Sequence, residues 1–205
     1  MYLKQREGWI EVITGPMYAG KTEELIRRVK RLEFAKQNII VFKPQIDDRY
    51  AKDEVVSHNN SRTRSINITQ AKDIMKYVND ETEVVAIDEI QFLDEEAVRI
   101  CEYLADSGIR VIVSGLDRDF RGEPFSFMPT LLSMAEEVTK LSAICVCCHT
   151  PATRTQRIVD GKPANYNDPI ILVGAKDSYE ARCRHCHEVP GKPKIYQIRP
   201  DSHDE

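Results

Sequence analysis

A glycine-rich loop near the N-terminus has the residue pattern of a phosphate-binding site. Residues 15–22 read G-P-M-Y-A-G-K-T and satisfy G-x-x-x-x-G-K-[ST]. The glycines let backbone N–H groups converge on phosphate oxygens, and a helix beginning here adds partial positive charge. Lys21 would reach the β- and γ-phosphates of a nucleotide, and the Thr22 hydroxyl would hold Mg²⁺. The alternative, a chance glycine-rich turn, fits the flanking sequence less well. The predicted nucleotide-binding residues are Gly15, Pro16, Met17, Tyr18, Ala19, Gly20, Lys21 and Thr22.

Two adjacent carboxylates, Asp88 and Glu89, follow the apolar run 84–87. In phosphate-loop proteins an aspartate at the end of such a strand anchors Mg²⁺, usually through water. Open α/β sheets also bind their ligands beyond the carboxyl ends of the strands. We therefore assign Asp88 to magnesium and Glu89 to base catalysis. The alternative is a solvated acidic turn, which the phosphate loop argues against.

Five of the six cysteines lie in the last third of the chain. Two C-x-x-C pairs can each form a knuckle, and two knuckles make a tetrahedral four-sulfur zinc site of structural type. The insert between the pairs exceeds ordinary zinc-ribbon spacing, so Cys147, His149, His185 and His187 remain alternative ligands. Buried structural thiols are the other interpretation. The predicted zinc ligands are Cys145, Cys148, Cys183 and Cys186.

Apolar runs alternating with helical patterns indicate how these residues are positioned. The runs 9–13, 39–42, 84–87 and 109–113 predict buried strands, and a further strand is expected over 138–144. Helical spacing appears over 21–35, 69–78, 95–106 and 129–135, whereas 45–64 is expected to be a long loop. This alternation predicts an α/β fold of the P-loop NTPase type, with a mostly parallel sheet flanked by helices. Cys101, on an apolar helix face, is expected in the core.

The composition shifts near residue 143, which indicates two domains. We expect a P-loop α/β domain over 1–143, a small zinc-binding domain over 144–191 and a disordered tail over 192–205. The net charge is −4, with no basic run, which argues against a nucleic-acid partner. No signal peptide or membrane-spanning run is apparent, so a cytoplasmic protein without a membrane partner is expected.

Three further stretches narrow the class of enzyme. They are D-D-R-Y at 47–50, D-E-I-Q-F at 88–92 and G-L-D-R-D-F-R-G-E-P-F at 115–125. With the phosphate loop and the paired C-x-x-C, their order resembles the type II, zinc-containing thymidine kinases from about residue 8 to 186. Tyr18 departs from the phenylalanine of many relatives. The resemblance implies a homotetramer of a P-loop domain with a zinc-stabilised lasso domain, which transfers the γ-phosphate of ATP to the 5′-hydroxyl of thymidine.

The resemblance also implies roles for individual residues. Lys21, Arg49 and Glu89 match catalytic positions, with Glu89 accepting the 5′-hydroxyl proton, and Asp47 and Asp88 match residues near the metal and phosphates. A surface salt bridge is the alternative for Arg49, as core packing is for the two phenylalanines in the predicted thymidine pocket. Those pocket residues are Met17, Leu116, Phe120, Phe125, Thr155, Tyr179 and, in a lasso over 163–178, Ile171, Leu172, Val173 and Gly174.

A pocket for the thymine methyl group favours thymine over uracil only about 10–200-fold, so deoxyuridine is expected to be a second substrate. The resemblance further implies nucleotide salvage for DNA synthesis and feedback inhibition by thymidine triphosphate. Two other functions share part of this set of motifs. A thymidylate kinase also has a D-R-Y segment, but much further from its phosphate loop. A zinc-ribbon, nucleic-acid-dependent ATPase requires a basic face and helicase-like motifs, which the sequence does not show.

Overall fold

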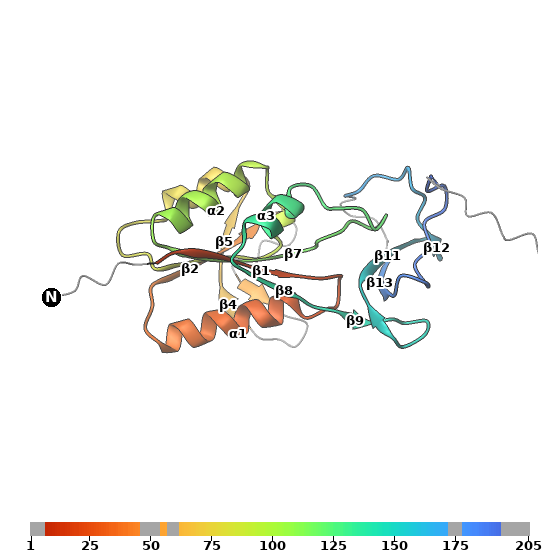
Figure 1. Cartoon of the computed structure of the whole chain (residues 1–205), viewed down its shortest axis with the longest axis horizontal. Coiled ribbons are helices and arrows are strands. Elements are labelled where there is room, and N and C mark those ends of the chain that lie inside the picture. Colours follow the sequence, from red (N-terminus) through yellow and green to blue (C-terminus); the bar gives the residue numbers. More distant parts are fainter. Residues whose placement is uncertain (1–6, 46–53, 57–61, 172–177, 194–205) are drawn as a thin grey trace, which may run out of the picture.

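The central sheet of the protein has six strands, and every pair of neighbours is parallel (Figure 1). The computed structural model describes residues 7–45, 54–56, 62–171 and 178–193. The strand order is β5-β2-β6-β7-β1-β8. The predicted α/β class with a mostly parallel sheet is therefore confirmed. The strands are β1 Trp9–Thr14, β2 Ile39–Pro44, β5 Ile66–Ile68, β6 Val84–Ile87, β7 Arg110–Gly115 and β8 Glu137–Lys140.

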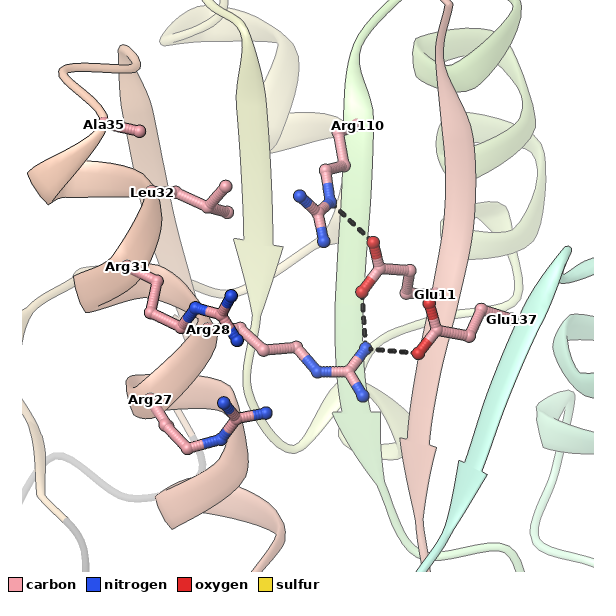
Figure 2. A pocket seen from close by; sticks show the side chains of 8 residues that line it. All are labelled: Glu11, Arg27, Arg28, Arg31, Leu32, Ala35, Arg110 and Glu137. Atoms are coloured by element: carbon pink, nitrogen blue, oxygen red, sulfur yellow. Dashed lines mark hydrogen bonds and ion pairs between the residues drawn. The ribbon is translucent and has the colours of Figure 1, made fainter.

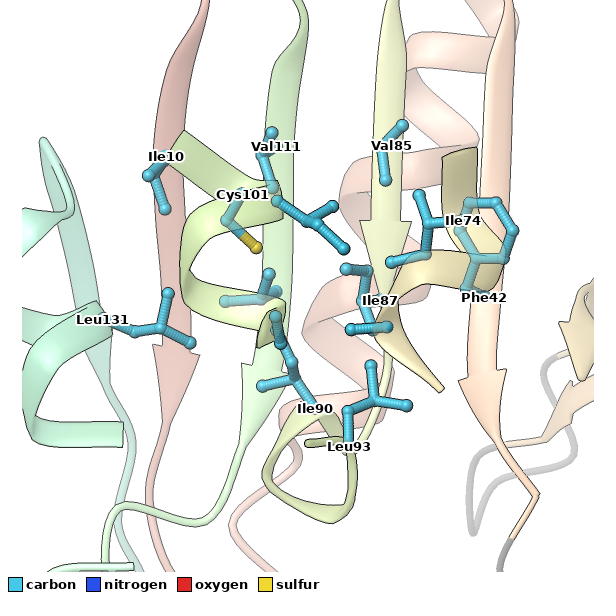
Figure 3. Packing of buried hydrophobic residues seen from close by; sticks show 14 of the residues in the cluster. Ile10, Phe42, Ile74, Val85, Ile87, Ile90, Leu93, Cys101, Val111 and Leu131 are labelled. Carbon is cyan, nitrogen blue, oxygen red and sulfur yellow. The ribbon is translucent and has the colours of Figure 1, made fainter. Parts of the chain in front are cut away.

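Helices cover both faces of this sheet, with α1 on one side and α2 and α3 on the other (Figure 1). Because successive side chains of a strand point to opposite faces, β6 contributes to two cores. Val84 and Ala86 pack in the smaller core together with residues of α1. Val85 and Ile87 pack in the larger core beneath α2 and α3, which also buries Cys101 as predicted (Figure 3). The helices are α1 Lys21–Phe34, α2 Glu96–Asp106 and α3 Met128–Met134.

The region predicted to be one long loop, 45–64, contains a short antiparallel hairpin. Its strands are β3 Glu54–Val56 and β4 Arg62–Arg64. Strand β5 was not predicted either; it has three residues and lies at the edge of the main sheet. Segments this short provide too few residues for a two-residue alternation to be recognised. Asp47 and Arg49 lie outside the described residues.

Two other predicted elements differ in detail from the structure. The strand expected over 138–144 is two strands, β8 in the main sheet and β9 Ala143–Ile144 in a separate hairpin with β10 Pro151–Ala152. The helix expected over 69–78 is the 3₁₀ helix η2 Ala71–Lys76, which begins with a capping box between Gln70 and Asp73. A second 3₁₀ helix, η3 Ile90–Phe92, follows β6.

The C-terminal region is built from short antiparallel strands, in contrast to the parallel main sheet. Strand β11 Arg154–Val159 pairs with β12 Lys162–Pro163 on one side and with β13 Ser178–Arg182 on the other. This change from parallel to antiparallel pairing follows residue 143, where the composition shifts. The domain limits at 143 and 191 stay predictions. Within the described ranges, no helix has both the length and the apolar character needed to span a membrane.

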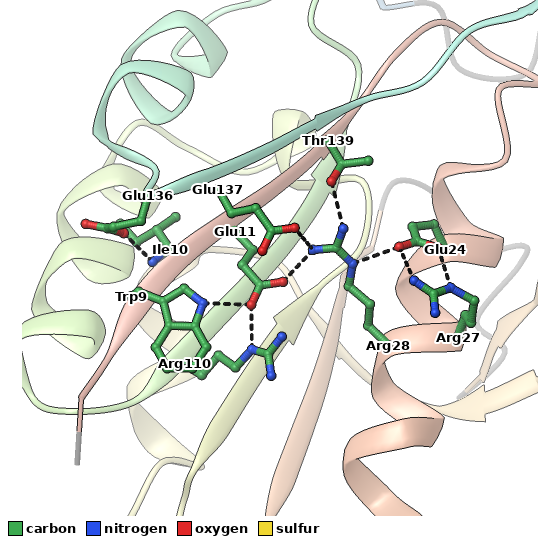
Figure 4. A network of polar contacts seen from close by, with 10 residues as sticks. All are labelled: Trp9, Ile10, Glu11, Glu24, Arg27, Arg28, Arg110, Glu136, Glu137 and Thr139. Atoms are coloured by element: carbon green, nitrogen blue, oxygen red, sulfur yellow. Dashed lines mark hydrogen bonds and ion pairs between the residues drawn. The ribbon is translucent and has the colours of Figure 1, made fainter. Parts of the chain in front are cut away.

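A charged network between α1 and the main sheet surrounds Glu11, at the middle of β1 (Figure 4). Its fully buried carboxylate accepts hydrogen bonds from Trp9 Nε1 at 2.7 Å, from Arg110 Nε at 2.5 Å and from Arg28 Nη1. Arg28 reaches across from α1 and also pairs with Glu137 at 3.1 Å. Burial acts to raise the pKa of Glu11, but the hydrogen bonds from Arg110 and Trp9 and the arginine charges bring it below its usual value.

Four arginines and two glutamates of this region line a cavity of about 390 Å³ between α1 and the sheet (Figure 2). Arg110 also lies over the Trp9 ring, with its guanidinium carbon 4.9 Å from the ring centroid. The sequence predicted a buried strand over 9–13 but no partners for Glu11. In the structure two arginines and a tryptophan N–H donate to its carboxylate, which is the arrangement that a buried carboxylate requires.

Candidate active site

The predicted phosphate loop joins the carboxyl end of β1 to the first residue of α1. Gly15 has φ of 147°, and a Cβ built there would lie 2.4 Å from the carbonyl oxygen of Leu141, so a side chain would collide with backbone. Gly20, with φ of 84°, precedes the helix in the left-handed region. The buried ammonium of Lys21 donates to the carbonyl oxygen of Pro16 at 2.9 Å. The loop therefore has the curled conformation and the helix start that phosphate binding requires.

Asp88 directly follows β6 and faces the beginning of α1. The Thr22 hydroxyl lies 3.2 and 3.4 Å from the two carboxylate oxygens, and the Ser114 hydroxyl of β7 donates to the same carboxylate. The Asp88 carboxyl is only 2% exposed. Burial and the neighbouring charge of Glu89 raise its pKa to about 6, although Ser114 and Thr22 act in the opposite direction. A carboxylate and a hydroxyl next to a phosphate loop are the hard oxygen ligands that suit Mg²⁺.

Glu89 lies beside Asp88 in the chain but in a different environment. It has φ of 52° and ψ of 41°, a left-handed conformation that is uncommon outside glycine, and it begins the turn into η3. Its side chain is half-buried, whereas that of Asp88 is buried. Glu89 Oε2 accepts a hydrogen bond from Gln91 Nε2, within η3, at 2.5 Å.

Several residues of the predicted thymidine pocket lie near this strand end. The Met17 N–H donates to Thr155 Oγ1 at 3.0 Å, which joins the phosphate loop to β11. Leu116 follows β7, is buried, and donates its backbone N–H to Gln91 Oε1 at 3.2 Å. Met17, Leu116 and Phe125 all contribute to the larger core. The structure thus brings Met17, Thr155 and Leu116 to the same end of the sheet as Glu89.

The two predicted aromatic residues have different surroundings. Phe125 is buried in the larger core, and its ring meets the edge of Phe92 with centroids 5.9 Å apart. Phe120 is buried between charged side chains: the guanidinium carbons of Arg121 and Arg157 lie 5.6 and 5.4 Å from its ring centroid. The core interpretation therefore describes Phe125 better than it describes Phe120.

The remaining predicted pocket residues belong to the C-terminal region, between 171 and 179, and their place in a thymidine pocket stays a prediction. Tyr179, on β13, lines a cavity with Ala181 and with Tyr18 of the phosphate loop. Ile171 is 48% exposed. Leu172, Val173 and Gly174 lie outside the described residues.

Three polar residues that we did not predict support this region. Ser114 and Gln91 hold the two carboxylates, as described above. Arg157 is the third: it is 2% exposed, donates from Nη1 to the carbonyl oxygen of Pro169 at 2.7 Å and contacts Phe120. Gln91 belongs to the D-E-I-Q-F segment quoted above, so the sequence contained a signal for it. Ser114 and Arg157 have no local signal, because their partners lie 26 and 12 residues away.

The paired cysteines converge in the C-terminal region. The ligand sulfurs of Cys145, Cys148, Cys183 and Cys186 all lie within 4.8 Å of one another. Tetrahedral zinc with Zn–S bonds of about 2.3 Å requires sulfurs roughly 3.8 Å apart, and Cys148 and Cys183 are separated by 3.6 Å. Four cysteines with this spacing fit a closed zinc site. Cys147 and the nearby histidines are not part of the cluster found among the described residues.

Residues 8–187 match the family described as thymidine kinase. The chain belongs to the thymidine kinase family. Membership makes the protein a phosphotransferase of this family, with thymidine and ATP as the substrates that the family implies. The matched span includes the phosphate loop, the carboxylate pair and all four cysteines of the cluster.

Proposed function

We propose that the protein transfers the γ-phosphoryl group of ATP to the 5′-hydroxyl of thymidine and, less efficiently, of deoxyuridine. The observation that supports this most strongly is a convergence at one end of the sheet. The phosphate loop, the Asp88–Thr22 pair, Glu89 and the Met17–Thr155 contact meet there. A donor loop, a metal-binding pair, a base and a contact from the loop to β11 are the components that such a transfer requires.

In the proposed reaction, Lys21 binds the β- and γ-phosphates at the positive end of α1. Thr22 and Asp88 would hold Mg²⁺, which would supply positive charge to neutralise the phosphates. Glu89 accepts the 5′-hydroxyl proton as the nucleoside O5′–phosphorus bond forms and the bond to the β-phosphate oxygen breaks, releasing ADP. Asp47 and Arg49 are proposed near the metal and phosphates.

The proposed nucleoside pocket lies between the phosphate loop and the C-terminal strands. We assign Met17, Leu116 and Thr155 to the thymine ring, because contacts bring them to the end of the sheet that carries Glu89. Phe120, Phe125 and Tyr179 remain proposed pocket aromatics, and backbone groups of 171–174 are proposed to bind the thymine edge. Small apolar contacts discriminate a methyl group weakly, so we expect deoxyuridine to have a kcat/KM about 10–200-fold lower.

We further propose a homotetramer that acts in the cytoplasm in pyrimidine deoxynucleoside salvage, with inhibition by thymidine triphosphate. A triphosphate can place its base in the acceptor pocket and its phosphates in the donor loop, so one molecule would occupy both sites. The four-cysteine cluster is proposed to hold one structural zinc ion, and metal analysis should then find about one zinc per chain.

The proposed function is tested by the acceptor that the enzyme uses. The protein is incubated with γ-labelled ATP, Mg²⁺ and either thymidine or thymidine monophosphate. Label in thymidine monophosphate made from thymidine is the expected result. Label that appears only when the monophosphate is the acceptor would support a thymidylate kinase. ATP hydrolysis that rises only when DNA is added would instead support a nucleic-acid-dependent ATPase.

A further inference from the structure

Gln91 occupies a buried position that connects two parts of the candidate active site. It lies within η3 and is only 2% exposed. Its Nε2 donates to Glu89 Oε2 at 2.5 Å, and its Oε1 accepts the Leu116 backbone N–H at 3.2 Å. Both ends of the side-chain amide are thus bonded, one to a proposed catalytic group and the other to a proposed pocket residue.

The two bonds permit only one orientation of the amide. If the nitrogen and oxygen were exchanged, the oxygen would face a carboxylate and the NH₂ group would face the Leu116 N–H, so both contacts would be repulsive. The side chain also packs closely against β7, because a Cβ built on Gly115 would lie only 2.6 Å from Gln91 Oε1. Gln91 therefore has little freedom to turn or withdraw.

Among the described residues, Gln91 provides the one side-chain hydrogen bond to the Glu89 carboxylate. Glu89 has a left-handed backbone and is half-buried. A side chain in that position would sample several rotamers unless a neighbour restrained it. The Gln91 bond engages Oε2 and no described residue donates to Oε1, so the contact orients the carboxylate through one of its two oxygens.

We propose that Gln91 is a positioning residue for the transfer: it aims the Glu89 carboxylate and ties that aim to the Leu116 loop. This inference rests on the proposed role of Glu89 as the base. A misplacement of about 1 Å in a reacting group can reduce a rate by about 100-fold. Loss of the Gln91 contact is therefore expected to lower kcat far more than it changes the KM for ATP, because Gln91 has no hydrogen bond to the proposed phosphate loop among the described residues.

Two variants disturb this contact by different routes. Gln91→Met keeps the side-chain length and removes both hydrogen bonds, whereas Gly115→Ala leaves Gln91 intact and pushes its oxygen away. Each should lower kcat about 10–100-fold, with the KM for ATP changed less than about threefold. The matched control is Gln37→Met, since no described residue forms a hydrogen bond with the Gln37 side-chain oxygen. It should retain wild-type kcat.

A third variant, compared at equal amounts of folded protein, distinguishes loss of positioning from loss of folding. Gln91→Glu keeps an acceptor for Leu116 but places a carboxylate against Glu89, so it should lower kcat at least as much as Gln91→Met. Rates are measured per folded molecule, with Tm recorded for every variant. A merely structural role predicts a lower Tm with kcat unchanged, and that result would overturn the proposal.

The same measurements in a Glu89→Gln background separate this inference from the proposed function. If Gln91 acts through Glu89, adding Gln91→Met to Glu89→Gln should reduce kcat by less than about twofold more. A further tenfold loss would overturn the positioning role. Near-normal transfer by Glu89→Gln alone would remove the base assignment, and the positioning role with it. An impaired Glu89→Gln beside a normal Gln91→Met would remove only the positioning role.

Discussion

Glu11 and Asp88 are both buried carboxylates of the same parallel sheet, yet their surroundings have opposite effects. Glu11, in the middle of β1, is bound by two arginines and a tryptophan N–H, and its pKa is below the usual value. Asp88, at the end of β6, is bound by two hydroxyls beside the charge of Glu89. Burial and that charge raise its pKa to about 6.

The difference separates a carboxylate whose charge is balanced within the fold from one that we propose to bind a cation. The negative charge of Glu11 is balanced by the guanidinium groups of Arg28 and Arg110. Among the described residues, no lysine or arginine forms an ion pair with Asp88; the charge of Lys43 and the two hydroxyls lower its pKa, but burial and Glu89 raise it by more. Carboxylates whose charge is incompletely balanced at the carboxyl ends of strands are typical of a functional site.

The largest stability effect is expected at the compensated site. Glu11→Gln leaves the Arg28 and Arg110 guanidiniums without their central anion, which should lower the unfolding free energy by about 3–5 kcal/mol at neutral pH. Urea unfolding measures this directly. Glu137→Gln is the control, because Glu137 is 54% exposed and its pair with Arg28 should contribute less than about 1 kcal/mol.

The wild-type pH dependence has a definite sign at Glu11. A lowered pKa means that its contribution to stability is present above the ordinary value of 4.5 and is lost as pH falls through the folded-state pKa. Glu11→Gln should therefore remove part of the acid-induced loss of stability. Equal stability of Glu11→Gln and wild type at neutral pH would contradict the comparison.

Asp88→Asn should have the opposite effect on stability. A pKa raised from 3.8 to about 6 means that the folded state favours protonated Asp88, so its contribution to stability is full below pH 3.8 and is lost as pH rises through 6. With Mg²⁺ chelated at pH 8, Asp88→Asn should raise the unfolding free energy by about 1–3 kcal/mol. The gain should shrink towards pH 4. Destabilisation at pH 8 would show that Asp88 is already compensated.

These two sites also show what can be read from a sequence. The phosphate loop, the run before Asp88 and the paired cysteines are recognised by local spacing, so the sequence predicted the fold class and the cysteine cluster. It did not predict the environment of Glu11, because the two arginine partners lie 17 and 99 residues away in the chain. Ser114 was not predicted for the same reason. Gln91 stood in a recognised segment, but its contact depends on the left-handed turn at Glu89.

A smaller effect is expected when one hydroxyl is removed from Asp88. Ser114→Ala deletes a hydrogen bond that favours the ionised carboxylate, so it should cost about 1–2 kcal/mol at pH 8 in chelator. The cost should be smaller at pH 5, where Asp88 is largely protonated. Thermal unfolding at the two pH values compares them, with Ser133→Ala as the exposed-serine control. A cost that is identical at both pH values would argue that Ser114 only fills space.

We propose that Glu89, at the carboxyl end of the sheet, is the base that accepts the 5′-hydroxyl proton during phosphoryl transfer. Single-turnover transfer from γ-labelled ATP to thymidine tests this role most directly. With ATP saturating, Glu89→Gln should slow transfer by about 100–10,000-fold while ATP affinity stays near the wild-type value. Transfer by Glu89→Gln at close to the wild-type rate would contradict the claim.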